Sequence, residues 1–511
     1  MPITIEVKLS PEEAASPTDI KTSVAREAGL PEEEVLHIRY LRKSLDARKG
    51  RILFLLKAEV YTTGETVNIP LRTFQYQKVS DQKSCHIIGF GPAGIYAALQ
   101  CLERGIKPII LERGKPVEER LKDISAIHKQ GILNPESNYC FGEGGAGTYS
   151  DGKLYTRSSK RGDIQKVLDV FIAHGADPRI GYEAHPHIGT NKLPRIIAAM
   201  RQSILANGGE IHFEQKVTGF RIANGYITHI VTADGTSLPC RQVILATGHS
   251  SRDIFEMLHR QQITLEAKPF ALGVRIEHSQ ELIDHIQYKQ DRGLLLPPSS
   301  YSLVTQACGR GVFSFCMCPG GVIAPAATAA HETVVNGWSS SARNGPFANS
   351  GLVVSVNPEN WTAYEKYGVL AALQFQKEVE QKTYSVVNSL QAPAQRVEDF
   401  IQNKVSNDLP RTSYQPGIVS HDLAQLLPPF ITQSLRQALV DFGKKMNGYR
   451  TNEAIVVGVE SRTSSPVRIP RSKETFRHPQ LQNLFPCGEG AGYAGGIVSA
   501  AMDGMACANA L

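Results

Sequence analysis

Five side chains that could take part in chemistry stand in polar clusters of the sequence: Lys153, His249, Arg252, Arg275 and Arg462. A histidine can exchange a proton near neutral pH, and an arginine can clamp a carboxylate or a phosphate through paired hydrogen bonds. A lysine can stabilise negative charge that develops during a reaction. We therefore treat these five residues as the candidate catalytic set.

The lysine and the histidine also have structural explanations. Lys153 follows Asp151 in the run SDGKLYTR, and the two could form a surface salt bridge. His249 precedes Ser250, where a helix is expected to begin, so it could belong to the cap of that helix. The sequence leaves both alternatives open.

The arginines can likewise be read in two ways. Arg275 and Glu277 alternate along a predicted strand, which places both side chains on one face. Glu460 and Arg462 stand just before the last glycine-rich segment, where they could bind a substrate carboxylate or form a structural ion pair.

Two cysteines, Cys316 and Cys318, are separated by one residue, which predicts both thiols on one face of a strand. The spacing C-x-C is uncommon for a redox pair, so two small core cysteines are the preferred interpretation. Cys140 and Cys487 each stand beside a glycine-rich motif and are ambiguous in the same way.

The glycine pattern Gly89-Phe-Gly91-Pro-Ala-Gly94 follows an apolar strand-like run and opens a helix. In that context the pattern predicts a dinucleotide site: a tight turn, a close approach of pyrophosphate to the backbone, and close packing of helix on strand. Glu112 ends the next strand, 23 residues after Gly89, where a carboxylate can accept both ribose hydroxyls. The phosphates are expected at the helix N-terminus.

Two further runs share the glycine spacing, at residues 142–147 and 490–495. The first lacks a preceding strand, and the second has no second strand–helix–strand unit after it, so one dinucleotide domain is predicted. Contacts from distant segments suit an extended cofactor, which favours non-covalent FAD over NAD. The residues expected to bind it, besides those named above, are Pro92, Ala93, Arg113, Gly144, Gly145, Ala146, Gly147, Thr148, Lys216, Val217, Ala246, Thr247, Gly248, Gly488, Glu489, Gly495, Gly496 and Ile497.

The elements that must position these residues predict an α/β protein in four segments. Residues 1–80 form a small N-terminal α/β (βαββ) domain with a basic hairpin tip, read as a solvated turn rather than an anionic docking patch. Residues 81–265 form the first part of a Rossmann-type FAD domain, and residues 451–511 form its C-terminal part. Residues 266–450 lose the alternation of strand and helix and form an inserted mixed α+β substrate or cap domain.

Whole-chain properties narrow the class. The formal charge of +6 is small against 104 charged side chains, so no nucleic-acid partner is expected. No membrane span is predicted, because the one long uncharged stretch, residues 311–330, contains two prolines and two internal glycines. Nine scattered cysteines favour a reducing, cytoplasmic location. No metal site is predicted, since His185 and His187, which flank a proline, lack partner ligands, and the oligomeric state stays open.

Long motifs carry a resemblance to a known family. They include FGEGGAGTYSDGKLYTR, PHIGTNKL, ATGHSSRDIFEML, KPFALGVRIEH, FSFCMCPGGV, VESRTSSPVRIPR and GEGAGYAGGIVSAAMDGM, with RKSLDARKG in the leading segment. Together they resemble the bacterial family of uncharacterised FAD-dependent dehydrogenases, over essentially the whole chain. The resemblance implies a fold similar to the glutathione-reductase-type flavoproteins and implies no substrate.

We therefore expect an FAD-dependent oxidoreductase that passes a hydride between flavin N5 and a small organic substrate. The alternative is a flavoprotein that acts on or with a macromolecule such as RNA through its leading domain. A third possibility is FAD as a structural element without turnover. NADH or NADPH, if it serves as a transient electron donor, has to enter the same cavity as the substrate, with Arg252 and Arg462 as its anion contacts.

Overall fold

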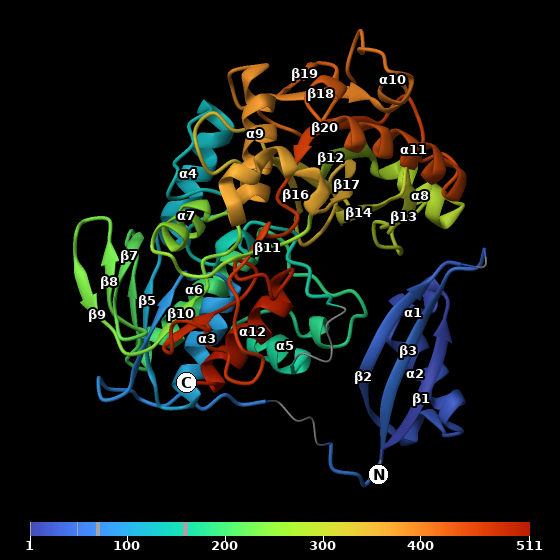
Figure 1. Cartoon of the computed structure of the whole chain (residues 1–511). Coiled ribbons are helices and arrows are strands. Elements are labelled where there is room, and N and C mark those ends of the chain that lie inside the picture. The colour runs from blue at the N-terminus through green and yellow to red at the C-terminus, as the bar shows by residue number, and fades with distance from the viewer. Residues whose placement is uncertain (1, 49, 68–71, 157–161) are drawn as a thin grey trace.

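The computed structural model describes residues 2–48, 50–67, 72–156 and 162–511 (Figure 1). Lys49 of the basic hairpin tip lies outside the described residues. Two larger sheets, one of five strands and one of seven, organise most of the chain, and a three-stranded sheet forms the leading unit.

The five-stranded sheet is entirely parallel and has the order β22-β10-β4-β5-β6. Its strands are short apolar runs, as expected where both faces of a sheet are covered. They are β4 (Ser84–Ile88), β5 (Lys107–Leu111), β6 (Glu210–His212), β10 (Val243–Leu245) and β22 (Leu484–Pro486). The strand β22 comes from the last segment of the chain and pairs directly with β10.

Helices cover this sheet, and two that are far apart in the sequence lie side by side: α3 (Pro92–Glu103) and α12 (Ile497–Asn509) (Figure 1). They approach so closely that a Cβ at Gly504 would lie 2.1 Å from the carbonyl oxygen of Ala93. Glycine is therefore required at that crossing. Further helices of this part are α4 (Val117–Gln130), α5 (Ile164–Ala173), α6 (Leu193–Ala206) and α7 (Arg252–Arg260).

The seven-stranded sheet has the order β13-β14-β17-β12-β20-β18-β19 and is antiparallel except for the pair β18–β19. Its long central strands are buried along nearly their whole length. The strands are β12 (Phe270–Ser279), β13 (Val304–Ala307), β14 (Arg310–Cys318), β17 (Phe347–Val356), β18 (Ala392–Arg396), β19 (Ile418–Ser420) and β20 (Ile455–Glu460). Its helices are α8 (Gln280–Tyr288), α9 (Ala371–Ser385), α10 (Val397–Gln402) and α11 (Pro429–Lys445).

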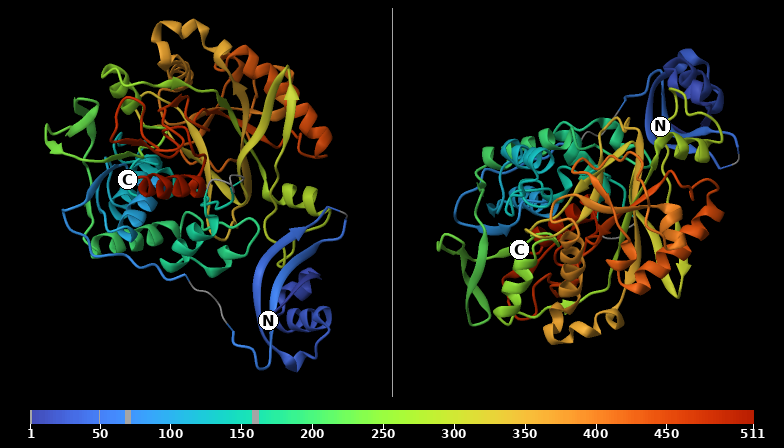
Figure 2. Two further views of the ribbon diagram at one scale, coloured as in Figure 1. Left: turned by 60° about the horizontal axis from the view of Figure 1, so that its bottom comes forward. Right: turned by 90° about the horizontal axis from the view of Figure 1, so that it is seen from above.

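The leading unit is a three-stranded antiparallel sheet with two helices on one face (Figures 1 and 2). A capping box at Ser10 starts the first helix, and Gly29, with φ of 68°, ends the second. Both views in Figure 2 show this unit beside the rest of the chain. Its elements are β1 (Ile3–Leu9), α1 (Pro11–Ala15), α2 (Pro17–Ala28), β2 (Val35–Asp46) and β3 (Leu53–Thr62).

Three small sheets complete the fold. They are built from β7 (Val217–Ala223), β8 (Tyr226–Thr232) and β9 (Ser237–Pro239), from β11 (Glu266–Ala267) and β21 (Val467–Arg468), and from β15 (Gly321–Pro325) and β16 (Val335–Ser339). Within the described part of the chain, every helix is too short or too polar to cross a membrane.

Candidate functional site

A cavity of about 320 Å³ opens where β4, β5 and β10 of the parallel sheet end. This is the edge at which open α/β sheets bind ligands. Eighteen of the residues expected to bind a cofactor line it: Gly89, Gly91, Pro92, Ala93, Glu112, Arg113, Gly145, Ala146, Gly147, Lys216, Val217, Ala246, Thr247, Gly248, Glu489, Gly495, Gly496 and Ile497.

Four residues of the expected set do not line the cavity but shape its walls. A Cβ at Gly94 would lie 2.0 Å from the carbonyl oxygen of Gly89, so this glycine sets the packing of α3 on the turn. Gly144 has φ of 77° in the second glycine run, and Thr148 Oγ1 donates to the carbonyl of Glu143 at 2.7 Å. The amide of Gly488 donates to Asp503.

Bare backbone faces open space at three cavity positions. A Cβ placed on Gly248, Gly495 or Gly496 would meet no heavy atom within 4 Å. Gly248 and Gly496 have φ of 71° and 118°, which favour glycine. Gly496 also caps α12, so that the N-terminus of this helix points into the cavity. A cofactor that approaches the main chain closely fits such a surface.

Glu112 joins three loops of the cavity wall. Its Oε2 accepts from the amide of Phe90 at 2.8 Å, and its Oε1 accepts from the amides of Gly114 at 2.9 Å and Gly142 at 3.0 Å. The side chain is buried, with 5% of its surface exposed. A carboxylate has about four acceptor positions, so one stays available to a ribose hydroxyl.

Arg120 on α4 holds the loop of the second glycine run in place through hydrogen bonds. The sequence analysis did not predict this role. Its guanidinium is fully buried and donates to four main-chain carbonyls. The acceptors and their distances are Asn138 at 2.8 Å, Glu143 at 2.7 Å, Tyr139 at 3.0 Å and Gly145 at 2.8 Å. An arginine on an amphipathic helix usually faces solvent, so the sequence held no signal for this position.

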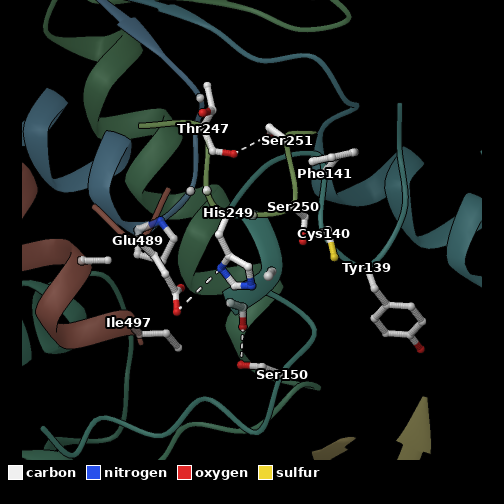
Figure 3. Close-up of a pocket in the computed structure, with 18 of the residues that line it drawn as sticks. Tyr139, Cys140, Phe141, Ser150, Thr247, His249, Ser250, Ser251, Glu489 and Ile497 are labelled. Atoms are coloured by element: carbon white, nitrogen blue, oxygen red, sulfur yellow. Dashed lines mark hydrogen bonds and ion pairs between the residues drawn. The ribbon is translucent and has the colours of Figure 1, made fainter. Parts of the chain in front are cut away.

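His249 lies in the cavity wall and faces Glu489 (Figure 3). Its Nδ1 is 3.8 Å from Glu489 Oε1, and its Nε2 donates to the carbonyl oxygen of Arg462 at 3.0 Å. Since a carbonyl can only accept, this bond fixes the proton on Nε2 in the neutral ring. Among the described contacts, none joins His249 to the first turn of α7, so the alternative that His249 belongs to the cap of this helix is not supported.

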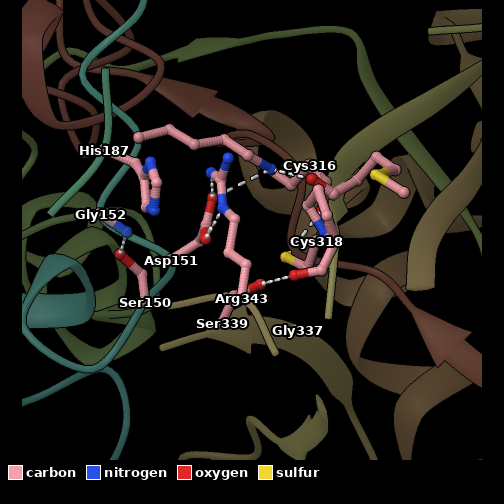
Figure 4. A network of polar contacts seen from close by, with 12 residues as sticks. Ser150, Asp151, Gly152, His187, Cys316, Cys318, Gly337, Ser339 and Arg343 are labelled. Carbon is pink, nitrogen blue, oxygen red and sulfur yellow. Dashed lines mark hydrogen bonds and ion pairs between the residues drawn. The ribbon is translucent and has the colours of Figure 1, made fainter. Parts of the chain in front are cut away.

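Lys153 and Asp151 both line the cavity, together with Cys316. Asp151 is only 4% exposed, so the pair is not a surface salt bridge. Arg343 binds the carboxylate through Nη2 at 2.6 Å and Nε at 3.2 Å, while Lys153 Nζ lies 3.6 Å away (Figure 4). Burial alone would raise the pKa of Asp151, but the two cations outweigh it and lower that pKa.

Two of the candidate catalytic arginines lie outside the cavity lining, which corrects the expectation for them. Arg252 pairs with Glu332 at 2.9 Å and with Glu380 at 2.7 Å. Arg275, fully buried, pairs with Glu460 at 2.9 Å. Carboxylates inside the protein therefore neutralise both guanidiniums.

Arg462 lines the cavity, but its guanidinium belongs to the same buried cluster. It contacts Glu332 at 2.7 Å and Glu380 at 2.9 Å. Burial would raise the pKa of Glu380, but Arg252 and Arg462 lower it to about 2. Glu460 pairs with Arg275, so the ion pair considered between Glu460 and Arg462 does not form. Arg252 and Arg462 are therefore poor candidates for the anion contacts of a visiting nicotinamide cofactor.

Cys316 and Cys318 both line the cavity, but they differ in exposure and in neighbours. The register of β14 against β17 shifts between Phe315 and Cys318, and Cys316 has φ of 45°. At this bulge Cys316 is exposed, whereas Cys318 is buried, with its Sγ 3.5 Å from Arg275 Nη2. A β-bulge reverses the alternation of side chains, and the sequence does not reveal it.

One group of metal-type side chains occurs among the described residues: Cys487, Asp503 and Cys507. The guanidinium of Arg471 already occupies this group, with Nη1 3.0 Å from Asp503 Oδ2 and 3.2 Å from Cys507 Sγ. The guanidinium of Arg471 thus stands where a metal ion would bind this group.

Further cavity residues were missed, and they come from two kinds of segment. Tyr139, Cys140, Phe141, Tyr149 and Ser150 flank the second glycine run, so a longer motif would have included them. Phe315, Asn336, Gly337 and Trp338 come from β14 and β16. No pattern of residue types marks a strand that reaches a cavity from another sheet.

Comparison with known proteins gives matches to three family models. Residues 269–463 match "FAD-dependent protein, C-terminal domain-like", residues 185–334 match "FAD dependent oxidoreductase", and residues 1–61 match "Domain of unknown function (DUF8436)". An uncharacterised protein of Clostridium beijerinckii (strain ATCC 51743 / NCIMB 8052) is 38% identical over 507 residues, which cover 95% of this chain and 94% of the relative.

Solved structures give more distant similarities. FqzB has a TM-score of 0.38 at 12% identity, over 86% of this chain and 78% of its own. CtdE in complex with FAD has a TM-score of 0.31 at 12% identity, over 83% of this chain and 82% of its own. Glycine oxidase from Bacillus cereus ATCC 14579 has a TM-score of 0.28 at 13% identity, over 85% of this chain and 94% of its own. Similarities of this size carry no argument about the reaction.

The family matches and the relative that is 38% identical over nearly the whole chain show that this protein belongs to the FAD-dependent oxidoreductases, with FAD as its cofactor.

Proposed function

We propose that this enzyme transfers a hydride between flavin N5 and a carbon atom of a small organic substrate bound in the cavity. One observation carries the proposal. The same cavity is lined on one side by the glycine loops at the parallel sheet and on the other by Phe315, Cys316, Asn336 and Trp338 from β14 and β16. A substrate between these walls would be enclosed beside the cofactor.

The fit of the walls suggests how FAD is held. The N-terminus of α3, after Gly91, suits the pyrophosphate, and Glu112 suits the adenosine ribose. Lys216 and Val217 suit the adenine edge. The bare backbone at Gly496, where α12 begins, suits the flavin ring.

FAD supplies the two-electron chemistry, and the chain supplies charges and a proton. The ammonium of Lys153 would stabilise negative charge in the cavity. His249, with its proton held on Nε2 by the Arg462 carbonyl, presents Nδ1 toward Glu489 and can accept a proton there.

We further propose the division of the chain that the sequence suggested, with residues 81–265 and 451–511 as the FAD domain and 266–450 as an inserted domain. The pairing of β22 with β10 supports a returning C-terminal segment. The seven-stranded sheet, most of which comes from residues 270–420, supports an insertion. The glutathione-reductase-type subclass stays part of this proposal.

The test is anaerobic reduction of the purified, FAD-loaded protein by a library of small metabolites, followed through the visible spectrum of the flavin. We expect at least one small organic compound to reduce or reoxidise the flavin in a saturable way. A flavin inert to every compound would contradict the proposal. Co-purifying nucleic acid with a strong salt dependence would favour a macromolecular substrate instead.

A further inference from the structure

A row of cationic side chains borders the cavity around one buried carboxylate. Arg343 binds Asp151 through two of its nitrogens, at 2.6 Å and 3.2 Å. Lys153 Nζ lies 3.6 Å from the same carboxylate, which is longer than a hydrogen bond. Figure 4 shows Asp151, Arg343 and His187 converging at this point. Arg343 therefore makes the hydrogen bonds to Asp151, and Lys153 adds a longer ion pair to the same carboxylate.

The ammonium of Lys153 also has donor capacity to spare. It can donate three hydrogen bonds, and among the described residues it has one acceptor within bonding distance, the carbonyl oxygen of Met317. Its side chain is 34% exposed and lines the cavity. An anionic ligand in the cavity can reach it without breaking the pair between Asp151 and Arg343.

A short segment, residues 182–187, connects these residues to the leading unit. The amide of Lys43 on β2 donates to the carbonyl of Tyr182 at 2.8 Å, and the amide of Ala184 donates to the carbonyl of Lys43 at 2.9 Å. Three residues farther along, His187 forms a β-bridge with Lys153. The docking of β2 thus brings its neighbouring residue Arg42 near enough to His185 for the charge of Arg42 to act on that imidazole.

The pKa values of the two histidines of this segment, His185 and His187, are lowered partly by nearby cations. Burial lowers the pKa of His185, and the charges of Arg42 and Arg343 lower it further. Burial also lowers the pKa of His187, with Arg343 and Lys153 adding to it and Asp151 opposing it. Cations from two separate parts of the chain therefore act on one short segment.

The carboxylates near these cationic side chains do not cancel their positive charge. Asp151 is bound by Arg343, and the pKa of Glu183 is raised by burial, against the opposing charge of Arg179. Five cations act on this segment, Arg42, Lys43, Lys153, Arg179 and Arg343, against three carboxylates, Asp151, Asp177 and Glu183. The approach to the cavity keeps a positive potential, which attracts and steers anions.

We propose that this row binds an anionic oxygen group of the substrate at the cavity rim, so that the substrate is a small carboxylate or phosphate ester, and that the leading unit supplies Arg42 to the row. The inference rests on the proposed function and names its substrate class. Lys153 makes the direct contact, and Arg42 acts by longer-range attraction.

Trp338 provides a reporter that needs no turnover. It lines the cavity, and the chain has only two tryptophans, so Trp361→Phe leaves Trp338 as the sole indole. In this background the holoenzyme is titrated with benzoate, phenyl phosphate and the neutral benzyl alcohol, and the fluorescence of Trp338 and the flavin spectrum are both recorded. The two anions separate a carboxylate from a phosphate preference.

We expect at least one of the two anions to bind about tenfold or more tightly than benzyl alcohol, the effect of one charge-assisted contact. Lys153→Met should weaken anion binding about tenfold, and Arg42→Gln about threefold. Lys153→Arg keeps the charge and should retain binding. Arg48→Gln, at an 83% exposed side chain of the same unit, is the matched control and should change nothing.

Equal affinity for the anions and the neutral probe would overturn the inference, as would binding that Lys153→Met leaves unchanged or a complete lack of binding. FAD content, measured for every variant, identifies any variant that misfolds. If Lys153→Met misfolds, the affinity of Lys153→Arg for the anions tests the inference instead. Anion binding together with a flavin that no compound reduces would overturn the proposed function alone. A flavin reduced as readily by neutral compounds as by anions would overturn this inference alone.

Discussion

The carboxylate of Glu112 accepts a hydrogen bond from the amide of Phe90, 2.8 Å away, inside the first glycine motif. The same side chain holds the amides of Gly114 and Gly142. A residue expected only to bind ribose therefore also fixes the relative positions of three loops. Its loss should affect both the shape of the cavity and the affinity for FAD.

Glu112→Ala should lower FAD occupancy and stability together. Hydrogen bonds to a charged acceptor contribute about 1.5–3 kcal/mol each. Loss of the three loop contacts should lower stability, and loss of the bond to a ribose hydroxyl should raise the dissociation constant of FAD about tenfold or more. Fluorescence of released flavin measures this. Glu118→Gln, at a 59% exposed carboxylate, should retain FAD. Normal occupancy in Glu112→Ala would refute the role of the three loops.

Arg120→Met should destabilise the folded chain by about 3 kcal/mol or more. The substitution keeps most of the volume but leaves four carbonyls without their donor, and each unsatisfied buried group costs about 1–3 kcal/mol. Urea denaturation measures the difference. Lys122→Met on the exposed face of the same helix is the control, and an equal loss there would point to a general effect on α4.

The contrast between Glu112 and Arg120 shows how far the sequence can be read. The glycine motif, its strand and its acidic partner are neighbours in sequence, so their spacing alone predicts the site. Arg120 acts on carbonyls 18 to 25 residues away, and only the folded loop brings them together. Arg275 and Arg462 stand out in the sequence as candidate catalytic residues, but their carboxylate partners depend on the packing of distant segments. Long-range ion pairs and the bulge at Cys316 could not be predicted from spacing.

Glu143 should make stability depend on pH. Burial raises its pKa from the usual 4.5 to about 7, against the opposing effects of the Val117 amide and Arg201. Between these pH values the folded chain holds a proton that the unfolded chain releases, so stability falls as pH rises from about 4.5 to 7. The group's contribution is about 3 kcal/mol.

Glu143→Gln should remove this part of the pH dependence. The free energy of unfolding, measured by urea denaturation at pH 5 and at pH 8 for both proteins, should fall less for the variant than for the parent chain. Glu119→Gln, at an exposed position on α4, should keep the parent slope. An unchanged slope in Glu143→Gln would show that this carboxyl is ionised in the folded state.

The double variant Cys316→Ser/Cys318→Ser should keep most flavin reduction and reoxidation. Both cysteines line the cavity, but Cys318 is buried against Arg275 while Cys316 is exposed at the bulge. The two thiols therefore occupy different environments and do not form a matched pair. Loss of turnover with FAD retained, together with a disulfide that cycles with substrate, would contradict this prediction.

Reduction by NADH or NADPH should be slow and weakly saturating. Among the described residues, one parallel sheet carries a dinucleotide motif, and β22, which precedes the last glycine run, is a strand of that same sheet. The other glycine run ends in a single 3-10 turn, Gly145–Gly147. A nicotinamide donor then has to use the substrate cavity, and substrate should compete with it in ping-pong fashion. Stopped-flow absorbance of the oxidised flavin tests this, with and without a substrate found in the metabolite screen. Fast, tight reduction through a ternary complex would reveal a second cofactor site.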